Sequence, residues 1–211
     1  MEAFVCLPKL KLTKARVNRE IYVVSIGTDL RGESNHRPPA VGSDNETLKK
    51  LTPEIQAAMK LAVIAVSNIF HNIDKDQAVS LSGDGIVLYP PADPQGMLAL
   101  HLAVVESDKG SRDIGKLLKG VFADKGVKDL LKEITTITAA SRGIPADLLT
   151  TFMGVAVKSL TTFLENNEDD ILFSHGHAGR AISKYGGSAE GKDYAIGNKK
   201  VEATLRVHAA E

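Results

Sequence analysis

Two histidines separated by one residue are the first feature of the sequence that suggests chemistry. They lie in the string His175-Gly176-His177. Residues i and i+2 of a β-strand share a face, so two imidazoles at this spacing can reach one zinc or iron ion. A third ligand is needed, and the other histidines are scattered singly at His36, His71, His101 and His208. The string predicts part of a metal site that an acidic residue, brought in by the fold, would complete. The competing interpretation is a polar pair beside a turn, whose glycines serve the backbone.

A second string resembles the start of a calcium-binding loop. Asn72-Ile73-Asp74-Lys75-Asp76 places side-chain oxygens at alternate positions, as the first half of an EF-hand loop does. Gln77 stands where that loop needs glycine, and Gly83 stands where it needs a bidentate glutamate. Asp74 and Asp76 are therefore a rival, non-standard metal site. The alternative is a polar helix end that leads into a turn.

Other common signatures are missing or incomplete. The sequence has no G-x-S-x-G string, and its glycine-bearing strings lack the lysine-serine pair of a phosphate loop. The single cysteine, Cys6, lies in an apolar stretch and is expected to be a buried, inert thiol. The acidic run at 165–170 is expected to be a solvated loop.

Composition limits the class of protein. Of the 211 residues, 43% are hydrophobic and 25% are charged, which predicts a globular chain with a real core. Lys plus Arg and Asp plus Glu are both 26, so no basic excess favours a nucleic-acid partner. Without a signal peptide or a 20-residue apolar span, we expect a soluble, cytoplasmic protein without a transmembrane helix.

The elements that would position these residues alternate between β and α character. Residues 9–17 and 20–28 are predicted to form a β-hairpin. Helical spacing of apolar residues predicts helices over about 44–71 and 111–165. Met97 to Val105 is apolar on both faces, which predicts a strand in the middle of a covered sheet. Residues 201–208 alternate between apolar and polar side chains, as a strand with one wet face does.

The order of elements favours an α+β fold in one domain, residues 1–211. We expect an antiparallel β-sheet or β-sandwich with the inserted helices packed against it, and with the first and last strands in one sheet. Two functions remain open. The first is a non-enzymatic binding or interaction module, which binds a protein or a small molecule and can form a homo-oligomer. The second is a metal-dependent, hydrolase-like enzyme that uses His175 and His177 with a divalent ion as cofactor.

Overall fold

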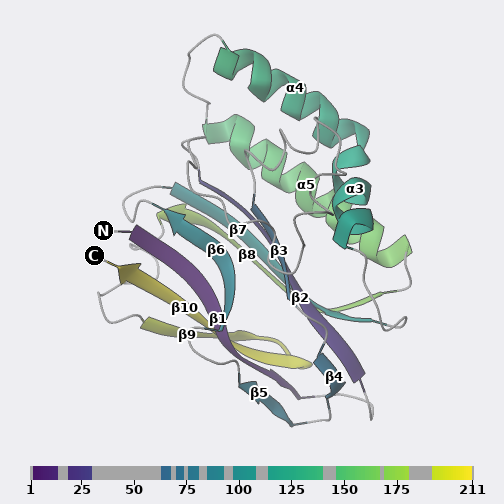
Figure 1. Cartoon of the computed structure of the whole chain (residues 1–211), viewed down its shortest axis with the longest axis vertical. Coiled ribbons are helices and arrows are strands. Elements are labelled where there is room, and N and C mark those ends of the chain that lie inside the picture. The colour runs from purple at the N-terminus through teal and green to yellow at the C-terminus, as the bar shows by residue number, and fades with distance from the viewer. Residues whose placement is uncertain are drawn as a thin grey trace.

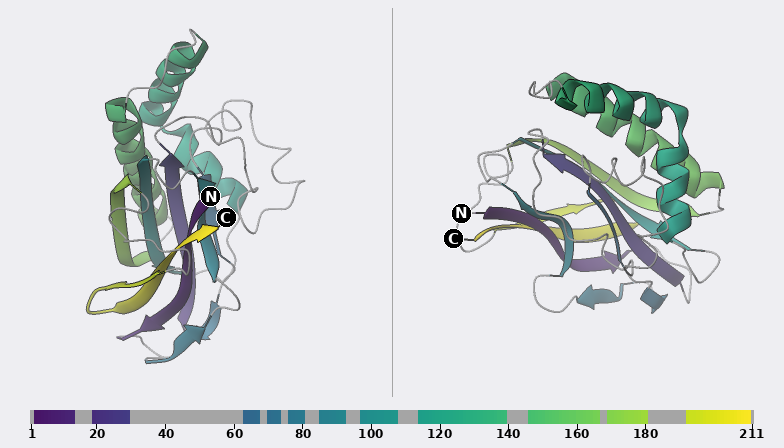
Figure 2. Two further views of the ribbon diagram at one scale, coloured as in Figure 1. Left: turned by 90° about the vertical axis from the view of Figure 1, so that its left-hand side faces the viewer. Right: turned by 45° about the horizontal axis from the view of Figure 1, so that its top comes forward.

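The computed structural model describes residues 2–13, 19–29, 63–67, 70–73, 76–80, 85–92, 97–107, 114–139, 146–166, 169–180 and 192–210. These residues form two antiparallel β-sheets and one layer of helices (Figure 1). The sheets lie face to face, and the helices cover the outward face of one of them (Figure 2). The α+β class predicted from the sequence is confirmed, with the sheets forming a β-sandwich.

The sheet farther from the helices is called the outer sheet. Its strands are β9 (Lys192–Gly197), β10 (Val201–Ala210), β1 (Glu2–Leu12), β5 (Ala78–Ser80) and β6 (Ile86–Ala92). β10 pairs with β9 and β1, while the far edge of β1 is shared by β5 and β6. Glu2 lies opposite Ala210, so the chain ends lie side by side (Figure 1). The prediction that the first and last strands join one sheet is confirmed.

The sheet between the outer sheet and the helices is called the central sheet. Its strands are β3 (Val63–Val66), β4 (Phe70–Ile73), β2 (Arg19–Asp29), β7 (Met97–Glu106) and β8 (Asp170–Arg180). β7 lies between β2 and β8, and β3 and β4 share the far edge of β2.

Alternation along β7 builds two cores. Leu100, Leu102 and Val104 pack toward the outer sheet. Ala103 and Val105 pack toward the helices, together with Ala99. Each of these side chains is at most 5% exposed. The prediction of a strand covered on both faces is therefore confirmed.

The helical layer consists of α3 (Ile114–Ala123), α4 (Lys125–Ala139) and α5 (Ala146–Asn166). Asp124 caps α4, because its Oδ1 accepts a hydrogen bond of 3.1 Å from the backbone N–H of Val127. The buried hydroxyl of Ser159 donates to the carbonyl oxygen of Val121 at 3.0 Å and ties α5 to α3. The helices predicted within 111–165 are confirmed for the residues described. None of these helices is long and apolar enough to cross a membrane.

The predicted hairpin between residues 9–17 and 20–28 is wrong. β1 belongs to the outer sheet and β2 to the central sheet, and the two do not pair. Burial explains the separation: Val23 and Val24 of β2 point to opposite faces and are both buried, whereas Lys9 of β1 is exposed. A strand with two dry faces belongs in the covered sheet.

The helix predicted over about 44–71 is wrong for its last residues, since 63–66 and 70–71 belong to strands β3 and β4. The segment from 44 to 62 lies outside the described residues. The run Val63-Ile64-Ala65-Val66 is rich in β-branched side chains, which favour strands. Ser67 ends β3: its N–H donates to the carbonyl oxygen of Val23 at 2.8 Å, and its Oγ accepts from the N–H of Val23 at 2.9 Å.

Candidate functional site

The His175-Gly176-His177 string lies within a long strand rather than beside a turn. β8 runs from Asp170 to Arg180 and pairs with β7 along its length. The register places His175 opposite Leu102 and His177 opposite Leu100. The two histidines therefore occupy alternate positions on the face that looks toward the outer sheet, as the sequence predicts for a strand.

The described strands leave the second side of β8 uncovered. Among the described strands β8 pairs with β7 alone, and on its other side Nδ2 of Asn198 donates a hydrogen bond of 2.9 Å to the carbonyl oxygen of Leu172. A one-residue bulge falls here, because Val104 faces Phe173 and Val105 faces Ile171. Beyond the bulge the register runs without interruption to Arg180.

The hydrogen-bonding direction of each β8 residue follows from one bond at the end of β7. The N–H of Ser107 donates to the carbonyl oxygen of Glu20 at 2.8 Å, so Ser107 directs its backbone toward β2. Backbone groups of successive strand residues point to opposite sides. The even-numbered residues of β7 therefore bond to β8, and their partners there are the odd-numbered residues, His175 and His177 among them.

The even-numbered residues of β8 consequently face away from β7. Ser174, Gly176 and Ala178 direct their N–H and C=O groups to the open side, as the outward carbonyl of Leu172 also does. Sequence reasoning missed this feature. The signal was present, because residues 171–179 contain no lysine, arginine or proline, the residues that commonly block an edge strand.

The other sheet edges are shorter or interrupted. β9 has six residues, begins with Lys192 and Asp193, and Asp193 forms a two-point ion pair with Arg206, with distances of 2.5 and 2.9 Å. The far edges of β1 and β2 are each covered by two short strands, and one strand of each pair, β6 on β1 and β4 on β2, has register shifts. Short, charged and irregular edges resist pairing with other strands. Among the described strands, β8 is the long edge that lacks these features.

His175 has an ordered environment on its strand. Its side chain is half-buried, and its ring stacks on the buried Phe173 with centroids 6.3 Å apart and an angle of 17° between the planes. Phe173 belongs to the core between the sheets. The aromatic neighbour thus restricts the orientation of the imidazole before any ligand binds.

A further histidine, His101, lies on the opposite face of the central sheet. It pairs with Gly176 on β8, and its Nδ1 lies 3.5 Å from the position that a Cβ on Gly176 would occupy. Burial lowers the pKa of His101 below its ordinary value of 6.5, and the nearby charge of His175 lowers it further. Because His101 faces the helical layer, it does not join the His175/His177 face.

The described residues offer few ligands for the second predicted metal site, at Asp74 and Asp76. Asp74 lies outside them. Asp76 has a positive φ of 64°, its N–H donates to the carbonyl oxygen of Leu12 at 2.6 Å, and its carboxylate lies 3.6 Å from Nζ of Lys11. The described residues contain no group of three or more His, Cys, Asp or Glu side chains placed to hold one metal ion. His175 therefore needs ligands from elsewhere if it is to bind a metal.

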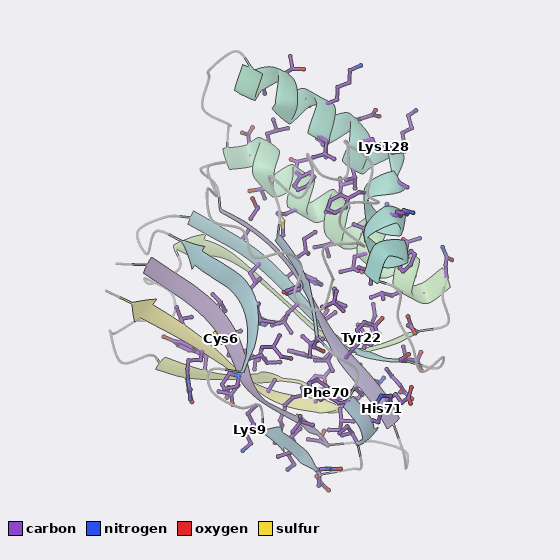
Figure 3. All side chains as sticks on the ribbon, viewed as in Figure 1. Cys6, Lys9, Tyr22, Phe70, His71 and Lys128 are labelled. Carbon is purple, nitrogen blue, oxygen red and sulfur yellow. The ribbon has the colours of Figure 1, made fainter. Side chains whose placement is uncertain are left out.

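The outward face of the outer sheet is polar. A shallow hollow of about 190 Å³ lies there, lined by Lys9, Lys11, Ala195, Ile196, Glu202, Ala203 and Thr204. Lys9 lies on β1, on the side remote from the helices (Figure 3). Lys11 contacts Glu202 at 3.7 Å in addition to Asp76, so positive and negative charges alternate across this face.

Two other predictions concern single side chains. Cys6 is fully buried, as predicted for an inert thiol. The acidic run at 165–170 is not wholly a solvated loop, because Asp169 is 4% exposed. Its Oδ2 accepts a hydrogen bond of 3.2 Å from the hydroxyl of the buried Tyr22, and its N–H donates to the carbonyl oxygen of Leu164. Asp169 thus ties the end of α5 to β2.

Comparisons with protein-family models, with curated proteins and with solved structures found no significant match.

Proposed function

We propose that the protein is a non-enzymatic interaction module that self-associates through the open edge of β8. The observation that carries this proposal is the alternation of backbone direction along β8. It leaves the N–H and C=O groups of Ser174, Gly176 and Ala178 directed away from the described sheet. Such a row of backbone groups is a template for strand addition.

A second copy of this chain fits that edge in one particular register. Two β8 strands that pair antiparallel about a two-fold axis at Gly176 place Ser174 of each copy opposite Ala178 of the other. All three outward residues then exchange hydrogen bonds. An axis at His175 would instead require Leu172, whose carbonyl oxygen already accepts from Asn198.

Size and charge support the same occupant. Ser174, Gly176 and Ala178 are small, so their side chains do not obstruct a second strand. The chain has no formal net charge, so two copies do not repel each other as whole bodies. The product would join two central sheets into one continuous antiparallel sheet.

Sedimentation velocity over a range of concentrations, with and without Zn²⁺, tests the proposal. The informative variants are Gly176→Lys and Gly176→Glu, which place like charges opposite each other at the axis. A Cβ at this position meets no close atom in the single chain, because its nearest neighbour is Nδ1 of His101, 3.5 Å away. We expect each variant to weaken association by about fivefold or more, since like charges directly opposite each other destabilise a sheet pair. An equimolar mixture of the two should associate again.

Gly154→Lys is the matched control. Gly154 is an exposed glycine on α5 with no other atom within 4 Å of an added Cβ, so the same change should leave association unaltered. A wild-type protein that stays monomeric under every condition would refute the proposal. So would Gly176 variants that associate as well as the wild type.

A further inference from the structure

We propose that His101 makes association at the β8 edge dependent on pH, so that copies joined at neutral pH separate in mild acid. This inference rests on the proposed function, because it concerns the contact between two copies. The controlling group lies on β7, one strand away from the edge.

His101 lies beside the residue at the proposed two-fold axis. The register pairs it with Gly176, and its Nδ1 lies 3.5 Å from the position of a Cβ on that glycine. Paired residues of neighbouring strands direct their side chains to the same face of a sheet. The imidazole of His101 therefore lies next to Gly176 on the face toward the helices, where the glycine has no side chain of its own.

Association brings the His101 side chains of the two copies toward each other. When Gly176 of one copy faces Gly176 of the other, the Cβ positions of this pair are about 4.5–5.5 Å apart. Each Nδ1 lies 3.5 Å from the Cβ position in its own copy, so the two Nδ1 atoms lie within about 12 Å of each other. The residues between them are the two glycines, which leave no side chain to separate the imidazoles.

The charge of His101 changes just below neutral pH. Burial lowers the pKa of His101 below 6.5, and the nearby charge of His175 lowers it further. His101 is therefore uncharged at neutral pH, and acid places one positive charge per copy beside the axis. Two unit charges about 12 Å apart, at an effective dielectric constant of about 20, repel each other enough to change an affinity by about tenfold.

The other described groups around His101 do not offset this charge. His175 on β8 acts in the same direction, and the neighbour on β2 is Ile26. The acidic groups on this face, Glu20 and Asp169, lie beyond Tyr22, which is opposite Val105 and so about 13 Å from His101 along the sheet. The buried side chains that α5 directs toward the sheet are uncharged: Phe152, Met153, Ala156, Leu160 and Leu164.

Sedimentation velocity at about pH 7.5 and about pH 5, in buffer of low ionic strength, tests the inference. We expect the dissociation constant to be about tenfold higher at the lower pH, while circular dichroism shows that the chain stays folded. Salt at about 0.5 M should reduce this difference, because it screens the repulsion between the two imidazolium groups.

The informative variant is His101→Gln, which keeps a polar side chain but does not titrate. It should associate with the same affinity at both pH values. The matched control is His71→Gln, which removes an exposed histidine paired with Glu20 and should leave the tenfold difference unchanged.

A measurement on the wild type guards against a folding defect in the variant. Proton binding and association affect each other reciprocally, so a second copy that resists the charge must also lower the pKa of His101. Histidine resonances followed by NMR during a pH titration should give a lower pKa for His101 in concentrated than in dilute protein. An equal pKa in associated and monomeric protein would overturn the inference.

The remaining outcomes separate this inference from the proposed function. Wild-type protein that associates equally well at both pH values would overturn the role of His101 and leave the β8 interface intact. A pH dependence that persists in His101→Gln would do the same. Chains that stay monomeric at both pH values would overturn both proposals.

Discussion

Replacing Gly120 by alanine should destabilise the protein, although alanine is the better helix former. A Cβ on Gly120 would lie 2.0 Å from Cδ2 and 2.4 Å from Cε2 of Phe163 on α5. Carbon atoms in contact lie about 3.5–4.0 Å apart, so the ring would have to move by about 1.5 Å. Overpacking of this kind costs about 1–3 kcal/mol, while the higher helix propensity of alanine returns about 1 kcal/mol. The difference between these two contributions should lower the free energy of unfolding by up to about 2 kcal/mol.

The same substitution at Gly154 should have the opposite sign. Gly154 is also inside a helix, but no other atom lies within 4 Å of its added Cβ. Only the propensity term remains, so Gly154→Ala should raise the free energy of unfolding by about 0.5–1 kcal/mol.

Urea denaturation followed by circular dichroism measures both variants. Phe163→Ala should remove the clash, so the double variant Gly120→Ala/Phe163→Ala should be more stable than the sum of the two single effects predicts. Equal stabilisation by Gly120→Ala and Gly154→Ala would show that α3 and α5 do not approach each other as described, and the reasoning would fail.

Two further predictions concern the central sheet. Leu100→Asp should abolish cooperative unfolding, because it buries an unpaired carboxylate between the sheets at a residue that is 3% exposed. The control, Ala195→Asp on the exposed side of β9, should fold normally. A stable Leu100→Asp protein would contradict the placement of β7. In chelator, the free energy of unfolding should fall as the pH drops below about 6.5. The pKa of His101 is lowered in the folded protein, so below this pH the unfolded chain binds a proton that the folded chain binds more weakly. His101→Gln should flatten that slope, and a slope unchanged by this substitution would exclude His101 as its cause.

Local sequence patterns predict those strands and helices whose conformation depends little on the segments that they pack against. The unbroken apolar character of residues 97–105 implies cover on both faces, and β7 has it. The apolar spacing between 111 and 165 and the cap at Asp124 likewise need no knowledge of the rest of the fold. In each case one local pattern fits one structure.

Pairing between distant segments is harder to predict. Residues 63–66 satisfy a helical period, yet pairing with the edge of β2 makes them a strand. β1 and β2 are close enough in sequence for a hairpin, but their different burial separates them into two sheets.

The dependence on distant segments also explains how little of the site around the histidine pair could be predicted. Spacing predicts that His175 and His177 share a face of a strand. It does not reveal that the strand is an edge, because that depends on where β7 and β9 lie. The outward direction of Ser174, Gly176 and Ala178 follows only once the register with β7 is known.

Amide hydrogen exchange along β8, measured residue by residue in dilute and in concentrated protein, tests most directly whether this edge pairs with a second copy. His175 and His177 bond toward β7, so their amides should be protected in both samples. The amides of Ser174, Gly176 and Ala178 should exchange rapidly in the monomer and become protected as the chains associate. If association leaves these three amides exchanging as fast as before, the copies meet elsewhere and the account of β8 is wrong.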